Sequence, residues 1–200
     1  MIGIIDYGVG NLFSLCSSCT AIGQEAFVSG DAAELSKADR LILPGVGAFG
    51  DAAEKLRTTG MADFVRSQAA QGKPLLGICL GMQLLFEKSY EYGCHEGLGL
   101  LAGQVVPMEG KLPADLKIPH MGWNALDVRG GRLLEGLNGQ YVYFVHSFFA
   151  ENCGDSLSAV TGYGVPITAA VEKGNVFGCQ FHPEKSGNVG LSILRRFAQL

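Results

Sequence analysis

The sequence is poor in charge and has no long apolar run. Charged residues make up only 17% of the 200 residues, and the 15 Lys plus Arg are scattered rather than gathered into a basic stretch. This scatter argues against a nucleic-acid-binding surface, and no apolar run approaches the length of a membrane-spanning helix. The chain begins without a basic segment and meets its first acid at Asp6, so we expect no secretory signal and a cytoplasmic protein.

Cysteine is present, but not in a pattern that marks disulfides or a zinc site. The six cysteines stand at positions 16, 19, 79, 94, 153 and 179, and in a reducing cytoplasm we expect thiols. Cys16 and Cys19 have CxxC spacing, yet no second such pair and no spaced pair of histidines completes a metal site. The surrounding residues instead make one apolar stripe at helical spacing, formed by Leu12, Leu15, Cys16, Cys19 and Ile22.

Apolar runs and helical patterns alternate through the first half of the chain. We predict short buried strands at 1–5, 25–28, 41–43 and 75–78, and helices at 11–22, 61–71 and 80–87. This βαβ rhythm is typical of an α/β protein, with a mostly parallel central sheet and helices on both faces.

The second half changes character, because Gly, Pro and Asn turns separate its apolar runs. We predict strands at 104–107, 141–145, 157–161, 167–171 and 176–181, which would extend the sheet in a mixed or antiparallel manner. A closing amphipathic helix is marked by Gly190, Ile193, Leu194 and Phe197. With no linker and no internal repeat, residues 1–200 are predicted to form one domain.

Cys79 lies where a predicted buried strand meets a predicted helix, between Gly77 and Gly81. A nucleophile elbow places its reactive residue on such a tight turn, and flanking glycines let neighbouring backbone pass close by. The helix amino terminus would stabilise a thiolate, and the amide of Leu80 would point at a developing oxyanion. A buried structural cysteine is the alternative, but the glycines and the flanking elements favour a nucleophile.

His182 and Glu184 follow the last predicted strand. Pro183 cannot continue a ladder, so the strand should end there and expose both side chains at the sheet edge. With one residue between them in extended backbone, both point the same way. Glu184 could then hold the imidazole while His182 carries the proton. Taken alone the tripeptide is more typical of a turn, but together with Cys79 it predicts a catalytic triad.

The glycine-rich segment 43–50 has two interpretations. Gly45, Gly47 and Gly50 match the GxGxxG of dinucleotide-binding proteins after a strand. That fingerprint expects an acid near the end of the following strand, to hold the ribose, and here that strand ends at Cys79. We favour the alternative, in which the backbone near Val46 and Gly47 supplies a second oxyanion amide beside Cys79.

These three motifs together resemble the class I glutamine amidotransferases with a Cys-His-Glu triad. Further segments are similar to one branch of that class, the glutaminase subunits (HisH) of imidazole glycerol phosphate synthase, and cover 5–12, 44–49, 77–87, 119–124, 143–147 and 182–186. The resemblance implies a flavodoxin-like three-layer fold and glutamine as the substrate. It also implies a heterodimer with the cyclase subunit HisF, which uses the ammonia to form imidazole glycerol phosphate and aminoimidazole carboxamide ribotide in histidine biosynthesis.

The same resemblance assigns further residues. Gln83 and the backbone around Ser147 and Phe148 are expected to hold the glutamine, although the family usually has Tyr where this chain has Phe148. Positions expected to face the cyclase are Asn11, Pro119, Met121, Trp123, Tyr143 and Lys185. Trp123 could instead be a core residue and Lys185 an ordinary exposed lysine, but Trp is enriched at the centres of interfaces.

The predicted chemistry needs no metal and no organic cofactor. Cys79 would attack the glutamine side-chain amide, and His182 would pass a proton to the leaving ammonia. Three alternatives stay open from the sequence. The chain could donate ammonia to another acceptor synthase, act as a stand-alone cysteine hydrolase, or be a binding subunit without activity.

Overall fold

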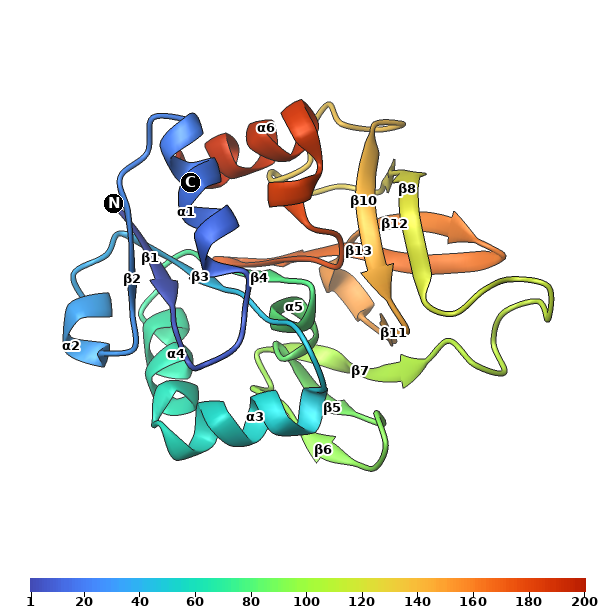
Figure 1. Cartoon of the computed structure of the whole chain (residues 1–200), viewed down its shortest axis with the longest axis horizontal. Helices are drawn as coiled ribbons and strands as arrows, with labels where there is room; N and C mark the ends of the chain where they lie inside the picture. The colour runs from blue at the N-terminus through green and yellow to red at the C-terminus, as the bar shows by residue number, and fades with distance from the viewer.

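The structure is a computed structural model that describes residues 1–200, and an eight-stranded sheet forms its centre (Figure 1). In spatial order the strands are β2 (Ala26–Ser29), β1 (Ile2–Ile5), β3 (Arg40–Leu43), β4 (Leu75–Ile78), β14 (Val176–Cys179), β13 (Val165–Lys173), β12 (Leu157–Tyr163) and β9 (Asp127–Val128). The first five are parallel and the last three antiparallel. The order 2-1-3-4 followed by β14 is the flavodoxin-like one, which confirms the predicted fold class.

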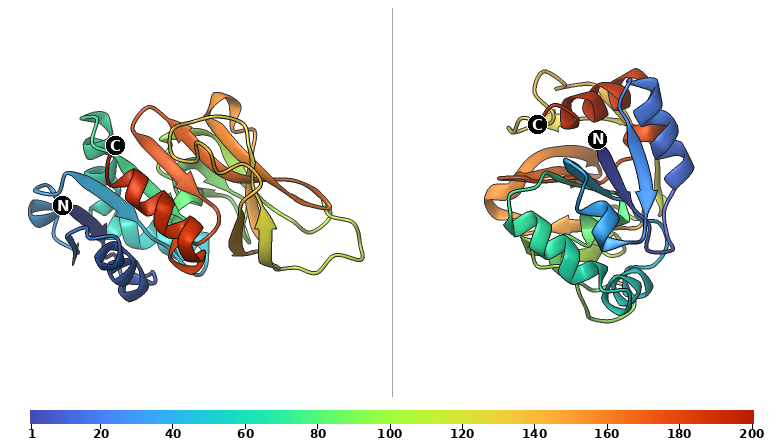
Figure 2. Two further views of the ribbon diagram at one scale, coloured as in Figure 1. Left: turned by 90° about the horizontal axis from the view of Figure 1, so that it is seen from above. Right: turned by 90° about the vertical axis from the view of Figure 1, so that its left-hand side faces the viewer.

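Helices cover both faces of this sheet (Figure 2). α1 (Leu12–Ala21) and α6 (Gly187–Phe197) pack on one face, and α3 (Phe49–Thr58) and α4 (Met61–Ala70) on the other. A short helix, α2 (Ala32–Leu35), lies beside β1 and β2. None of the helices is long and apolar enough to cross a membrane.

Both helices of the first face bury the stripes that the sequence predicted. The buried residues of α6 are Gly190, Ile193, Leu194 and Phe197. Each fully buried large apolar side chain contributes ~1.5–3 kcal/mol relative to exposure, so this face holds α6 on the sheet. In α1, Leu15 and Cys19 are buried in the same cluster, and all six cysteines of the chain are free thiols.

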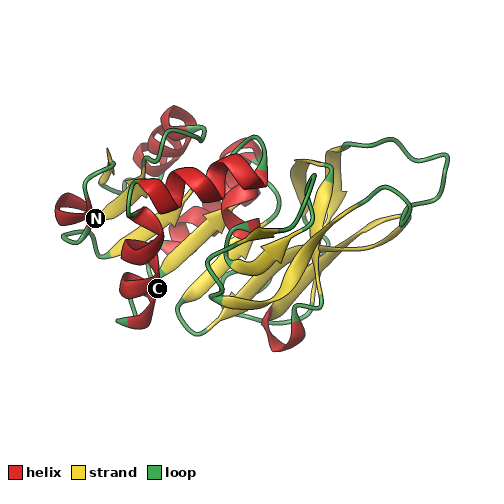
Figure 3. Ribbon diagram, turned by 90° about the horizontal axis from the view of Figure 1, so that it is seen from below, coloured by secondary structure: helices red, strands yellow, loops and turns green.

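Two smaller sheets complete the fold, and their strands pair antiparallel except for β5 with β7. One pairs β10 (Tyr141–His146) with β8 (His120–Ala125), and the other has the order β11 (Phe148–Glu151), β7 (Leu101–Pro107), β5 (Phe86–Ser89) and β6 (His95–Glu96), with β5 parallel to β7. A helical turn, η1 (Gly154–Ser156), precedes β12. In Figure 1, β5 and β6 lie beside α3, whereas β8 lies at the end of the molecule away from α1 to α4. The long connection between β7 and β8 projects from that end, as Figure 3 also shows.

The predicted helix 80–87 is wrong in length. The helix α5 (Leu80–Gln83) has one turn, and the chain continues as strand β5. The carbonyl of Leu84 accepts the amide of Leu98, and the carbonyl of Leu85 accepts those of Leu100 and Leu101. Those carbonyls are therefore not free to continue the helix. An unbroken apolar run such as Leu84–Phe86 fits a helix or a strand equally well.

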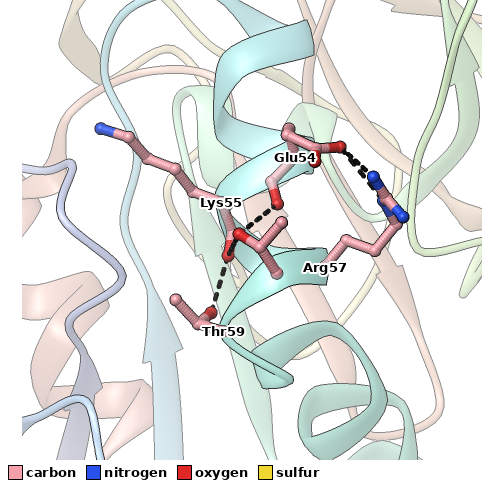
Figure 4. Close-up of polar contacts among 5 residues, drawn as sticks. Glu54, Lys55, Arg57 and Thr59 are labelled. Atoms are coloured by element: carbon pink, nitrogen blue, oxygen red, sulfur yellow. Dashed lines mark hydrogen bonds and ion pairs between the residues drawn. The ribbon is translucent and has the colours of Figure 1, made fainter.

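Helix α3 was not predicted, because segment 43–50 was considered only for its glycines and no element was assigned to the residues that follow it. Phe49, Ala52 and Leu56 are its buried residues and have helical spacing, so the signal was present. On its exposed side Arg57 pairs with Glu54, and the Thr59 hydroxyl donates to the Lys55 carbonyl over 2.7 Å (Figure 4). Such exposed pairs contribute little to stability.

The main sheet joins strands from both ends of the sequence. β4 pairs in parallel with β14, a strand from about a hundred residues further on, and the register places Ile78 beside Cys179. Neither half can complete the sheet without the other. We infer from this that residues 1–200 form a single domain.

Candidate active site

Cys79 occupies the turn between β4 and α5 in a strained backbone conformation. Its φ of 55° and ψ of −114° lie in a region that residues other than glycine rarely adopt. The Cys79 amide donates to the carbonyl of Cys179 over 2.7 Å, so β14 holds the turn in place. Strain of this kind is retained where the surrounding structure determines the geometry, often at functional sites.

The glycines on both sides of Cys79 allow backbone segments to approach closely. A Cβ on Gly77 would lie 2.6 Å from the carbonyl oxygen of Gly81. A Cβ on Gly81 would lie 1.9 Å from the carbonyl oxygen of Leu43, at the end of β3. Any side chain at either position would push the elbow away from the neighbouring strand.

His182 and Glu184 form a buried pair beside the elbow. His182 Nδ1 lies 2.8 Å from Glu184 Oε1, and their side chains are only 3% and 1% exposed. The predicted exposure of these side chains is wrong, and the backbone is extended at His182 but not at Pro183. β14 ends at Cys179, and Glu184 lies in the helical turn η2 (Pro183–Lys185) that Pro183 begins.

The surroundings of His182 favour its protonated form. Burial by itself would lower the pKa of His182, but hydrogen bonds and negative charge from Cys79 and Glu184 outweigh it and raise the pKa to about 9. At neutral pH the ring is therefore an imidazolium that faces the sulfur and can protonate a leaving amine. Because α5 has only one turn, its dipole is a weaker partner for the sulfur than the sequence suggested.

Backbone amides are available on both sides of Cys79. Leu80 is the first residue of α5, so its amide has no intrahelical acceptor. The glycine loop packs against the elbow, because a Cβ on Gly45 would lie 2.8 Å from the amide nitrogen of Gly81. The amides of Val46 and Gly47 donate to no backbone carbonyl, and Gly47 has a φ of 93°.

A pocket of about 330 Å³ opens at the elbow and brings most of the predicted site residues together. Those that line it are Val46, Gly47, Cys79, Leu80, Gln83, Ser147, Phe148, His182 and Lys185. Residues not predicted for this site also line it, namely Glu91, Tyr92, Val145 and His146. Glu184 does not line the pocket and contacts His182 from behind. The volume suits a small ligand such as an amino acid.

Gln83 links the floor of the pocket to its wall. Its Nε2 donates to the carbonyl of Phe148 and to Oε1 of Gln180, each over 3.0 Å. Both amide hydrogens are therefore engaged, and the side-chain oxygen is left to meet a ligand. The carbonyl of Ser147 accepts the amide of Met108, whereas the amide of Ser147 donates to no backbone carbonyl.

Glu91 is a site residue that was not predicted from the sequence. It lies in the connection between β5 and β6, is 8% exposed, and accepts the amide of Phe49 over 2.8 Å. Burial raises the pKa of Glu91, and the Phe49 amide works against this rise. Glu91 is the one acid that lines the pocket, so it can pair there with a cationic group. No motif among the residues around Glu91 indicates that it belongs to the site.

Of the residues predicted to face a partner, Met121, Trp123 and Tyr143 lie on one side of β8 and β10. Met121 and Trp123 are 61% and 53% exposed, so the alternative of Trp123 as a core residue is wrong. The rings of Trp123 and Tyr143 meet edge to face at 6.0 Å, and Lys185 Nζ lies 6.0 Å from the Tyr143 ring centre. Pro119 is exposed just before β8.

Asn11 lies elsewhere. It is the residue immediately before α1 and is half-buried. It does not belong to the side of β8 and β10 that carries Trp123.

The fold and the triad geometry define the class of this protein, the class I glutamine amidotransferases. Residues 4–199 match the family described as "Glutamine amidotransferase class-I". Curated relatives called imidazole glycerol phosphate synthase subunit HisH are similar over their whole length. The chain is 52% identical to that of Caldanaerobacter subterraneus subsp. tengcongensis, covering 100% of this chain and 98% of the relative. It is 49% identical to that of Rhodopirellula baltica, covering 99% and 97%. The chain therefore belongs to the HisH family of class I glutamine amidotransferases.

Solved structures agree on the fold. A crystal structure described as a glutamine amidotransferase superposes with a TM-score of 0.78 at 23% identity, covering 99% of this chain and 97% of the other. A structure of PurLQS from Thermotoga maritima gives 0.76 at 21% identity with the same coverage. At these identities the likeness concerns the fold alone.

Proposed function

We propose that this chain is the glutaminase subunit of an imidazole glycerol phosphate synthase. It hydrolyses L-glutamine to glutamate and ammonia and passes the ammonia to the cyclase subunit HisF. One observation carries the proposal, namely that a single pocket combines Cys79 on its strained turn, the protonated His182, and unpaired backbone amides. The full-length similarity to HisH subunits supports the choice of synthase.

The first half of the reaction forms a thioester. The sulfur of Cys79 attacks the side-chain carbonyl carbon of glutamine, and the carbonyl oxygen becomes an oxyanion. The amides of Leu80 and of the Val46–Gly47 loop stabilise this charge. His182 then donates its proton to the amide nitrogen, the C–N bond breaks, and ammonia leaves. Glu184 holds the imidazole in position throughout.

The second half returns the enzyme to its starting state. Water attacks the thioester carbonyl while His182 takes one of its protons. The oxyanion collapses, the C–S bond breaks, and the sulfur of Cys79 regains its pairing with the imidazolium. Glutamate leaves the pocket. The new carboxyl group of the product gives up its proton to solvent, so one water molecule and one released proton complete the balance of the cycle.

Glu91 is proposed to bind the α-ammonium group of glutamine. We expect Glu91→Gln to raise the KM for glutamine by ~10-fold or more and to change kcat much less, because the charge pair is equal in the ground and transition states. Steady-state glutaminase kinetics measure both constants. Glu87→Gln on β5, an exposed position outside the pocket, is the control. A loss confined to kcat would contradict this role.

The aromatic side of β8 and β10 is proposed to dock the cyclase. We define this aromatic face by Met121, Trp123, Tyr141, Tyr143 and Lys185, most of them well exposed. Lys185 also lines the pocket, so the face borders the place where ammonia is released. By the same proposal, Pro119 and Asn11 lie at the rim of the contact, and Lys185 pairs with an acid on the cyclase.

Trp123→Ala tests this docking surface. We expect the dissociation constant of the complex to rise by ~30-fold or more, since a central Trp in an interface commonly contributes over 2 kcal/mol. Calorimetry or light scattering measures it, and the free chain should keep its thermal midpoint because Trp123 is exposed. Val28→Ala is the control, because Val28 is 37% exposed on β2, at the opposite edge of the main sheet from the aromatic face. Equal weakening by both variants would reject the assignment.

The experiment that tests the function mixes the chain with a HisF cyclase, glutamine and the cyclase substrate. We expect glutamine-dependent formation of imidazole glycerol phosphate, with glutaminase activity low in the free chain and raised in the complex. A free chain as fast as the complex would favour a stand-alone hydrolase. Glutaminase activity without product formation by this cyclase would favour an ammonia donor to another synthase.

A cytoplasmic location is a further proposal, and the free thiols accord with it.

A further inference from the structure

Two further histidines are buried beside the pocket, and the proposed mechanism does not use them. His120 on β8 and His146 at the end of β10 are 0% and 7% exposed. His120 Nδ1 lies 3.0 Å from His146 Nε2, and His146 Nδ1 lies 2.8 Å from the carbonyl oxygen of Phe148. His120 Nε2 lies 2.9 Å from Oδ1 of Asn124. Contacts of hydrogen-bond length join these four residues in a row.

We propose that His120 and His146 are positioning residues that fix the Ser147–Phe148 wall of the pocket through the carbonyl of Phe148. The inference rests on the proposed function, because it assigns that wall to the binding of glutamine. Two donors from separate elements meet on this carbonyl, His146 Nδ1 and Gln83 Nε2. A carbonyl oxygen can accept both, and together they determine where the wall lies relative to α5.

The carbonyl of Phe148 sets the tautomer of His146. A carbonyl oxygen only accepts, so His146 carries its proton on Nδ1 and donates it to Phe148. Burial lowers the pKa of His146 to about 3, and the nearby His120 and His182 act in the same sense. Burial also lowers the pKa of His120, with the Asn124 contact opposing it. The pair is therefore neutral at neutral pH. Its two ring protons serve two of the three contacts, because Phe148 O and Asn124 Oδ1 both only accept, and the proton of His146 goes to Phe148.

Ring packing also holds His120 in place. The His120 ring stacks on Phe144 at 4.9 Å between centres and on Tyr163 at 4.1 Å. Asn124, the outer member, donates to the carbonyl of Gly162 over 3.0 Å. His120 therefore cannot turn without displacing β10 or β12.

The pair also connects the wall to the aromatic face. Along β8, His120 is buried and Asn124 half-buried, whereas Met121 and Trp123 alternate with them on the exposed side. One strand thus carries both the proposed partner contacts and the support of the glutamine wall. A shift of β8 on docking would act on Phe148 through His120 and His146.

The test measures glutamine binding by calorimetry in a Cys79→Ala background, which needs no turnover. The amide nitrogen of Asn can stand in for Nδ1 of His146, so His146→Asn should keep the dissociation constant within ~3-fold. Gln reaches instead toward the Nε2 position, so His146→Gln should weaken binding by ~10-fold. His120→Phe keeps the stacking and lies outside the pocket lining, and it should weaken binding by ~5-fold. Thermal midpoints verify that each variant is folded.

Nitrogen NMR of the imidazoles gives a second readout that does not depend on glutamine. We expect His146 in the Nδ1–H tautomer, with no titration between about pH 6 and 9. Ordinary titration, an Nε2–H tautomer, or equal binding by all three variants would overturn the positioning role. A Cys79→Ala parent that binds no glutamine would instead overturn the proposed function, and the NMR result would still decide whether the row of histidine contacts exists.

Discussion

Cys79→Ala in the complex is expected to abolish glutamine-dependent product while leaving ammonia-dependent product unchanged. Without the sulfur no thioester forms, and the loss should reach ~10³-fold or more, as for other nucleophile deletions. The cyclase reaction itself is untouched because external ammonia bypasses the pocket. The measurement is the rate of product formation, first with glutamine and then with an ammonium salt at the same pH.

The control for this change is Cys153→Ala. Cys153 is also a buried free thiol, but it does not line the pocket. It should keep both activities. Retention of glutamine-dependent activity by Cys79→Ala would remove the proposed nucleophile, and equal loss of both activities would point to a damaged complex rather than to missing chemistry.

Glu184→Gln is expected to lower kcat/KM by ~10²–10⁴-fold and to move its alkaline limb to lower pH. The pKa of His182 is raised from 6.5 to about 9, so the imidazolium is present below that pH and is lost as pH rises through about 9. Removing the Glu184 charge takes away one of the causes of the rise, and the limb should shift toward the ordinary value. The pH profile of kcat/KM for glutamine measures it.

The raised pKa of His182 also makes folding stability depend on pH in the same direction. A group whose pKa is raised on folding contributes stability that is fully present below the unfolded value of 6.5 and is lost as pH rises through about 9.

Glu172→Gln is the control for the kinetic effect of Glu184→Gln, because Glu172 pairs with Arg132 away from the pocket. It should leave the alkaline limb in place. An unchanged limb in Glu184→Gln would mean that Glu184 does not set the protonation of His182.

The sequence by itself determined the features that are local. A buried strand, a cysteine between two glycines, and a helical start are neighbours along the chain, so the turn at Cys79 could be predicted without its surroundings. Pro183 marked the start of the helical turn η2 for the same reason, whereas β14 already ends at Cys179. The stripe of α6 was equally local, because a helix buries residues at a spacing that the sequence displays.

Only the tertiary structure decided the rest of the site. Glu91 reaches the pocket through the amide of Phe49, a partner 42 positions away, and His120 meets His146 across 26 positions. Such contacts depend on which strands pair and in which register, and no spacing along the chain reports that. The end of α5 also depends on distant residues, because the carbonyls of Leu84 and Leu85 accept hydrogen bonds from the amides of residues 98, 100 and 101. The nucleophile was readable from its own segment, whereas its pocket exists because the parallel pairing of β4 with β14 brings two distant segments to one sheet edge.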